Sequence, residues 1–149
     1  MPLSLSYSLL HIIFSTKGRE PMIPEELLPK LHAYMATVSR SLECECYQVG
    51  GISDHVHLAI RIHRTVTISH LVKKLKTTST HWMKREHQVN NFSWQRGYGA
   101  FSLSPKDLPT LRRHILNQAT HHRKRDYQEE LLEFLHKYGL DYDEQYLWD

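Results

Sequence analysis

Two histidines stand one residue apart in the segment GGISDHVHLAI, which covers residues 50–60. Over the stretch 51–62 the apolar residues fall mainly on even positions, whereas His55 and His57 fall on odd ones. This alternation is typical of a β-strand with one buried face, so both imidazoles should share the other, polar face. A rise of about 3.3 Å per residue separates their Cα atoms by about 6.6 Å, which lets both bind one cation. Pairs of half-exposed histidines without a metal show the same spacing, so the spacing alone leaves both interpretations open.

A second set of polar side chains recurs at helical spacing later in the chain. The apolar pattern after Pro105 predicts a helix that runs to the basic segment 122–125, and one of its faces carries His114, Gln118, His121 and Arg125. If this helix crosses the polar face of the sheet, the amide oxygen of Gln118 can join the two imidazoles. Mixed nitrogen and oxygen ligands suit Mg²⁺ or Mn²⁺ with a bound phosphate better than a closed zinc site. Such a cation would neutralise charge on a phosphodiester during phosphoryl transfer.

The charge of the chain is unevenly distributed. Residues 1–125 hold 18 Lys and Arg against 8 Asp and Glu, which gives +10, whereas residues 126–149 hold 1 against 8, which gives −7. A basic body attracts polyanions and indicates a nucleic-acid partner, because phosphate neutralisation supplies much of the affinity for nucleic acids. A solvated basic surface is the plainer alternative.

Basic and aromatic side chains mark candidate contacts with a nucleic acid. We predict phosphate contacts from a lysine-rich helix and from the basic segment 122–125, namely Lys73, Lys74, Lys76 and Arg123. For each lysine a merely solvated helix face is an equal alternative. Three aromatic residues could stack on unpaired bases, although aromatics in a strand more often lie in the core: Trp94, Tyr98 and Phe101.

The remaining pattern predicts the elements that must position these residues. Strands are expected over residues 4–15, 44–49 and 52–62, and a loop and a strand over residues 92–103, with the Gly50-Gly51 pair as a tight hairpin turn. Helices are expected from residue 25 or 29 to 41, after an N-cap at Thr67 or Ser69, from Pro105 onward, and between residues 126 and 139. This order predicts one α+β domain over residues 1–149, a ferredoxin-like antiparallel four-stranded sheet with helices mainly on one face.

The chain offers no sign of a membrane or of an oxidising compartment. No apolar run approaches the roughly 18 residues of a membrane span, and the N-terminal segment has no basic region of a signal peptide. Cys44 and Cys46 are too few for a disulfide framework and are expected to be packing thiols. We therefore expect a cytoplasmic protein.

Five segments in order resemble a known family. They are GGISDHVHLAI, ISHLVKKLKTTSTHW, FSWQRGYGAFS, RRHILNQATHHRK and YQEELLEFLHKYGLDYDEQYLW. The chain resembles the single-tyrosine HUH transposases of the insertion-sequence 200/605 type, the TnpA-like proteins, over nearly its whole length. The resemblance implies that His55 and His57 are the metal ligands and that Gln118 completes the ligand set. It also implies a homodimer, with sites completed across the interface, that cleaves and transfers folded single-stranded DNA during DNA transposition.

The chain departs from this family at the nucleophile. Family members carry a tyrosine four residues before the glutamine, and this tyrosine attacks the phosphate; here the position holds His114. A phenolate forms a stable phosphodiester, whereas an imidazole would form a labile phosphoramidate. Tyr127 follows thirteen residues later, and on one continuous helix of about 100° per residue it would face more than about 90° away from position 114. We expect Tyr127 to lie beyond the end of this helix and to pack, and not to replace the nucleophile.

Four interpretations of His114 stay open: an extra metal ligand, an inefficient nucleophile or base for water, a loss of catalysis with DNA binding retained, or an engineered or erroneous residue. Our main expectation is a transposase-type protein that holds a phosphodiester against a divalent metal for strand cleavage, with His114 as the candidate catalytic residue. The alternative is a non-catalytic descendant that binds DNA hairpins without cutting them. A more remote one is an RNA-binding sheet domain.

Overall fold

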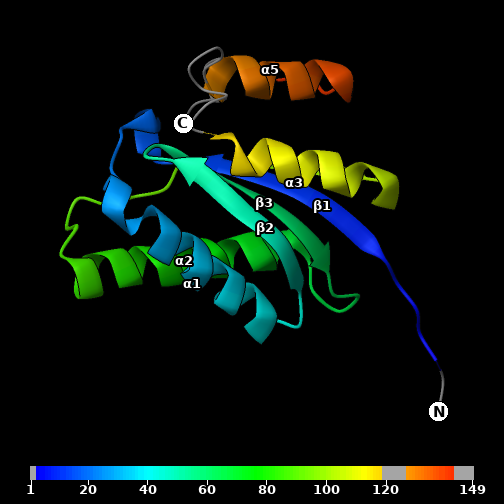
Figure 1. The fold of residues 1–149 in the computed structure, drawn as a ribbon, viewed down its shortest axis with the longest axis horizontal. Coiled ribbons are helices and arrows are strands. Elements are labelled where there is room, and N and C mark those ends of the chain that lie inside the picture. The colour runs from blue at the N-terminus through cyan, green and yellow to red at the C-terminus, as the bar shows by residue number, and fades with distance from the viewer. Residues whose placement is uncertain (1–2, 119–126, 143–149) are drawn as a thin grey trace.

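An antiparallel sheet of four strands runs through the middle of the molecule (Figure 1). The computed structural model describes residues 3–118 and 127–142. The strands lie in the order β2-β3-β1-β4, which is the order of a ferredoxin-like sheet. The elements along the chain are β1 (Ser8–Ser15), α1 (Leu28–Ser41), β2 (Glu45–Ile52), β3 (His55–Ile62), α2 (Ile68–His87), β4 (Gly99–Leu103), α3 (Leu108–Leu116) and α5 (Tyr127–Lys137).

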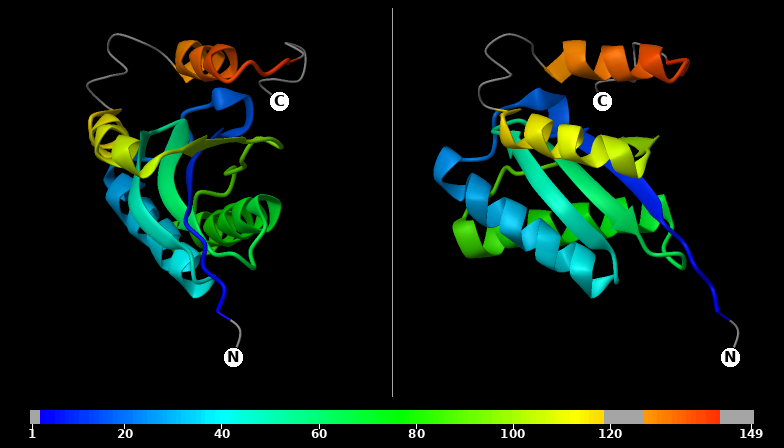
Figure 2. Two further views of the ribbon diagram at one scale, coloured as in Figure 1. Left: turned by 90° about the vertical axis from the view of Figure 1, so that its right-hand side faces the viewer. Right: turned by 45° about the vertical axis from the view of Figure 1, so that its right-hand side comes forward.

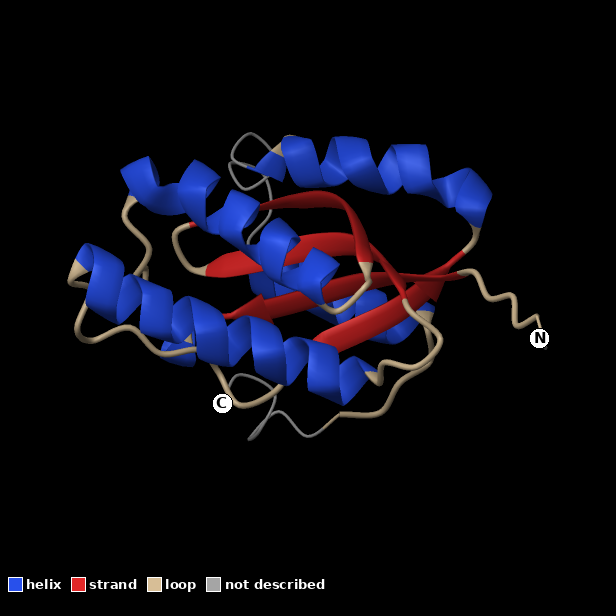
Figure 3. Ribbon diagram, turned by 90° about the horizontal axis from the view of Figure 1, so that it is seen from below, coloured by secondary structure: helices blue, strands red, loops and turns tan. Residues whose placement is uncertain are grey.

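Helices cover both faces of this sheet. α1 and α2 lie on one face, as the view from below shows, while α3 and α5 lie on the other (Figures 2 and 3). The larger core lies beneath α1 and α2 and includes Ile12, Leu58, Leu31, Met35, Leu71 and Leu75. A smaller core joins Ile13, Phe101, Leu131 and Leu135 beneath α5. The α+β class and the four-stranded antiparallel sheet are confirmed, with the difference that helices are not confined mainly to one face.

The two long helices follow from their sequence pattern. In α1, Leu31, Met35 and Val38 are buried at helical spacing. α2 begins after Thr67, whose hydroxyl oxygen accepts a hydrogen bond from the backbone N–H of His70 at 3.1 Å. The predictions of both helices are therefore confirmed. Among the described residues, no helix is long and apolar enough to cross a bilayer.

The Gly50-Gly51 pair does not form the predicted hairpin turn. Both glycines lie inside β2, where Gly50 pairs with His57 on β3, and the turn is made by Ser53 and Asp54. A Cβ atom on Gly50 would lie 2.6 Å from the main-chain oxygen of Ile115. The missing side chain therefore lets α3 approach the sheet closely, which a local turn signal cannot reveal.

Two other boundaries differ from the sequence pattern. β1 begins at Ser8 and not at residue 4, whereas the strand expected within residues 92–103 is β4 at the end of that segment. α3 ends at Leu116 with Asn117 as its C-cap, so the predicted helix does not continue unbroken to Gln118. The predicted stripe residues His121 and Arg125, and the capping residue Asp126, lie outside the described residues. α5 ends at Lys137, and Gly139 adopts a left-handed φ of 64°, as expected for a residue after a helix.

Candidate metal centre

The two histidines of β3 lie side by side on the face of the sheet that α3 and α5 cover. His55 and His57 are fully buried, and their ring centroids are 5.0 Å apart. Their common face follows from the alternation of side chains along the strand. The sequence pattern therefore placed both imidazoles correctly relative to each other, but it suggested a polar face where the structure has a buried one.

Gln118 reaches this pair from the segment after α3. Its side-chain oxygen lies 3.2 Å from Nε2 of His55, and its amide nitrogen donates to the main-chain oxygen of His114 at 3.1 Å. The second bond orients the amide so that its oxygen points toward the imidazole. Ligands at about 2.0–2.1 Å in neighbouring octahedral positions lie about 3 Å apart, so this contact has the right length for a shared cation. The three residues expected to bind a metal are thus brought together within one chain.

A second residue holds the outer nitrogen of each imidazole. Asp54 Oδ1 lies 2.7 Å from Nδ1 of His55, and His11 Nε2 lies 2.8 Å from Nδ1 of His57. The Nε2 atoms are then the ones that face inward, toward Gln118 and toward Glu130 on α5. Partners on the outer nitrogen are the usual way in which proteins orient histidines that bind metals.

His11 is suited to accept a hydrogen bond as a neutral imidazole and not to carry a positive charge. Its pKa is lowered to about 3, chiefly by burial, with His114 and Lys137 acting in the same direction and Glu130 in the opposite one. A neutral His11 can accept a hydrogen bond from the N–H of His57 Nδ1. That arrangement leaves Nε2 of His57 with its lone pair for a cation.

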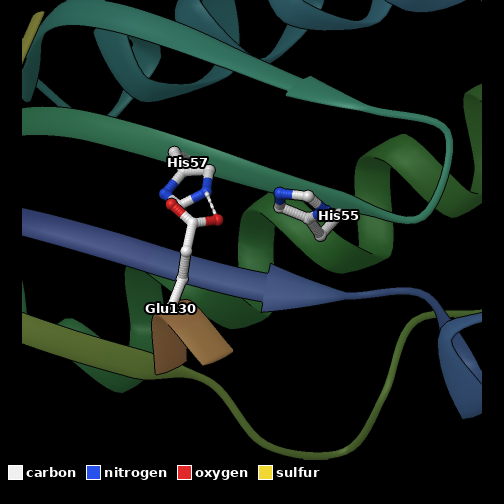
Figure 4. Close-up of side chains that lie close together, drawn as sticks. All are labelled: His55, His57 and Glu130. Carbon is white, nitrogen blue, oxygen red and sulfur yellow. Dashed lines mark ion pairs between the residues drawn. The ribbon is translucent and has the colours of Figure 1, made fainter. Parts of the chain in front are cut away.

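Glu130 is a site residue that the sequence pattern did not reveal. It lies on α5 with 2% of its surface exposed, and its carboxylate faces the imidazoles (Figure 4). One oxygen lies 3.9 Å from Nε2 of His57, and the other lies 2.8 Å from Nε2 of His114. Candidate ligand atoms of His55, His57 and Glu130 lie within 4.8 Å of one another. The signal in the sequence was an acidic residue four positions before Phe134, inside the apolar stripe of this helix.

His114, the candidate catalytic residue, lies at the rim of the cluster. Its side chain is 26% exposed, and its ring centroid is 5.7 Å from that of His57. Tyr127 lies beyond the end of the helix that carries His114, as expected, because α3 ends at Leu116 and Tyr127 begins a different helix. The rotation along one continuous helix therefore does not apply to it. The Tyr127 side chain lies outside the described residues.

The predicted phosphate contacts are not gathered at this cluster. Lys73 and Lys74 are exposed on α2, on the opposite face of the sheet. Lys76 donates to the main-chain oxygens of Gln95 and Gly97 at 2.8 and 2.7 Å, and partial burial lowers its pKa to about 8. The ammonium group of Lys76 thus binds the loop that contains Gln95 and Gly97. Arg123 lies outside the described residues. Of the three aromatics, Trp94 and Phe101 are buried in the cores, whereas Tyr98 is 41% exposed.

Comparisons with known proteins agree with this fold. A comparison with curated proteins found no match. Among solved structures, the chain is similar to a protein of Deinococcus radiodurans R1 assigned as a transposase, with a TM-score of 0.61 and 20% identity over 79% of this chain and 95% of that one. It is also similar to a REP-associated tyrosine transposase bound to a REP hairpin, with a TM-score of 0.58 and 15% identity over 82% and 74% of the two chains. At these identities both likenesses show the fold alone.

A family model resolves the relationship. The model described as "Transposase IS200 like" matches residues 4–118, a span that includes His55, His57, His114 and Gln118 but not Glu130. The match covers well over half of the chain, and the resemblance of the five segments points to the same family. The chain therefore belongs to the family of IS200-like transposases.

Proposed function

We propose that this protein binds folded single-stranded DNA and positions one phosphodiester for cleavage at a divalent metal, Mg²⁺ or Mn²⁺, held by His55, His57, Gln118 and Glu130. We call these four residues the metal centre. The observation that carries the proposal is that both imidazoles are held by their outer nitrogens and aim Nε2 at side-chain oxygens from two other elements. The hairpin bound to the REP-associated tyrosine transposase supports folded DNA as the substrate class.

The donor set fits such a cation. Two neutral imidazoles, an amide oxygen and a carboxylate give the mixed nitrogen and oxygen ligation that suits Mg²⁺ or Mn²⁺. A bound cation would neutralise negative charge on the phosphate oxygens in the transition state. His11 and Asp54 would keep the imidazoles in place, and the burial of both rings would limit the access of water to them.

The contact between His114 and Glu130 favours one role for His114. Nε2 of His114 lies 2.8 Å from Oε1 of the buried Glu130, and a carboxylate this close to an imidazole stabilises the positive charge that forms on protonation. We infer that His114 acts as a base for water. Water would attack the phosphorus and pass a proton to the imidazole of His114, while the P–O bond to one deoxyribose would break and the departing oxygen would take a proton from solvent. Cleavage would then proceed without a covalent protein–DNA intermediate.

The test is incubation of end-labelled hairpin DNA with Mn²⁺ and four proteins: wild type, His57→Ala, His114→Ala and His114→Tyr. We expect cleavage by the wild type, a loss of about 100-fold or more in the first two variants, and a covalent adduct with His114→Tyr. The exposed His81 on α2 provides the control His81→Ala, which should cut like the wild type.

Cleavage that appears only with His114→Tyr would reject this role of His114 and favour the non-catalytic hairpin-binding protein.

The homodimer implied by the family is a further part of the proposal. Since Gln118 contacts His55 of its own chain, we propose that each subunit of such a dimer can carry a complete metal centre.

A further inference from the structure

A cavity of about 560 Å³ lies beside the metal centre, between β4, α3 and α5. His11 and His114 line it, and these same residues contact His57 and Glu130 of the metal centre. A molecule in this cavity would therefore lie next to any phosphate at the metal. The volume is within the range of about 300–1,000 Å³ found for small-molecule sites and far exceeds that of a few waters.

The aromatic wall of the cavity is held in position by the protein itself. Tyr138 donates its hydroxyl hydrogen to the main-chain oxygen of Ser102 at 2.7 Å. Phe134 stacks on Phe101, with 5.3 Å between ring centroids, and meets the edge of His11 at 4.9 Å. Rings fixed in this way lose little freedom when a flat molecule packs against them.

Polar groups also line the cavity. Asp107 and Thr110 come from the start of α3, where Asp107 is the N-cap residue, yet its carboxylate does not cap the helix. The carboxylate accepts instead from the hydroxyl of Ser104 at 2.9 Å. Lys137 on α5 adds one exposed cation to the wall. A flat ring with amino groups, joined to a phosphate, matches this combination of aromatic, acceptor and cationic groups.

We propose that this cavity binds the base of the nucleotide next to the scissile phosphate, and that it prefers a base with an exocyclic amino group. The carboxylate of Asp107 can accept from the amino group of cytosine, adenine or guanine, whereas thymine presents a carbonyl oxygen and a methyl group there. The inference rests on the proposed function, because that function places the phosphate at the metal centre. The cavity would add a sequence preference to the cleavage site.

The experiment is a titration of ¹⁵N-labelled protein in Mg²⁺ with dCMP, dAMP, dGMP, TMP and inorganic phosphate. We expect the three amino-bearing nucleotides to shift the amide signals of Thr110, Leu111 and Tyr138, and to bind at least about fivefold more tightly than TMP. Asp107→Asn should remove this preference, whereas Asp141→Asn, an exposed residue outside the cavity, should keep it. Thr110→Trp, which fills the cavity, should abolish the nucleotide shifts and leave Mg²⁺ binding unchanged.

Equal affinity for all four nucleotides, or shifts confined to the metal centre and matched by inorganic phosphate, would overturn the inference and leave the proposed function standing. A different outcome is also possible: nucleotides shift the cavity signals, Asp107→Asn alters these shifts, and Mg²⁺ leaves the signals of His55 and His57 unchanged. That result would support the cavity as a base site and reject the proposed function. The two proposals can therefore fail separately.

Discussion

At the scale of single residues, one side-chain type performs several tasks around the site. His55 and His57 present Nε2 inward, His11 holds His57 by its outer nitrogen, and His114 pairs with Glu130. These tasks differ because each ring nitrogen can be a donor, an acceptor or a metal ligand, and its partner selects which. Residue type alone therefore could not separate the ligands from the residues that orient them.

His11→Phe should weaken Mn²⁺ binding by about 10- to 100-fold, the usual effect of removing a partner of a metal-bound histidine. Isothermal titration calorimetry checks the affinity. His11→Gln offers an amide oxygen to His57 Nδ1 and should recover part of the loss, which a purely structural defect would not allow. His63→Gln, directly after the last residue of β3, is the control. Equal Mn²⁺ affinity in His11→Phe and the wild type would show that His11 does not orient His57.

At the scale of elements, the close contact between β2 and α3 positions the site. Gly50 pairs with His57, and its Cα faces the main chain of Ile115, three residues before Gln118. A short distance between these two elements is thus required for the amide of Gln118 to reach His55. The same contact keeps His114 near Glu130, so one glycine links the packing of α3 to both halves of the site.

Gly50→Ala should push α3 away, because the new methyl group would lie 2.6 Å from the Ile115 oxygen. Overpacking of this kind costs about 1–3 kcal/mol in the free energy of unfolding, which urea denaturation measures. We also expect weaker Mn²⁺ binding, as Gln118 moves from His55. Gly97→Ala is the matched control, since its Cβ would meet nothing within 4 Å. Unchanged stability and metal affinity in Gly50→Ala would contradict this account.

At the scale of the whole molecule, the sheet separates the proposed site from the lysine-rich helix. The cavity is lined from β4, α3 and α5, whereas Lys73 and Lys74 are exposed on α2. α2 lies on the other side of the sheet from α3 and α5 (Figure 1). A DNA strand that contacts both must pass around an edge of the sheet. The exposed Tyr98 precedes the edge strand β4 and lies 5.9 Å from the Lys76 ammonium. We therefore expect the lysines to add affinity without taking part in cleavage.

Lys73→Ala combined with Lys74→Ala should lower the salt dependence of hairpin binding. Each lost phosphate contact reduces the slope of log K against log salt by about 0.7–0.9. Fluorescence anisotropy at several salt concentrations measures this slope, and cleavage at saturating DNA should not change. Lys17→Ala combined with Lys30→Ala removes the same charge from other exposed positions and is the control. If both pairs reduce the slope equally, the effect is general charge and not a contact on α2.

Features that depend on neighbours along the chain could be predicted before the structure was known. The common face of His55 and His57 follows from the period of a strand, and the buried faces of α1 and α2 follow from the period of a helix. The helix start at Thr67 follows from a side chain that bonds three residues ahead. The order of these elements then sufficed for the ferredoxin-like sheet.

Contacts between residues far apart in the chain depend on how the elements pack in three dimensions. His11 and His57 are 46 positions apart, and His55 and Gln118 are 63 apart. Glu130 joins them from a helix whose own pattern shows only an acidic residue in an apolar stripe. A glycine at position 50 is consistent either with a turn or with a close approach of another backbone. The structure shows the second, because the main chain of α3 lies against Gly50. Such choices depend on side-chain contacts between elements, and periodicity along the chain carries no information about those contacts.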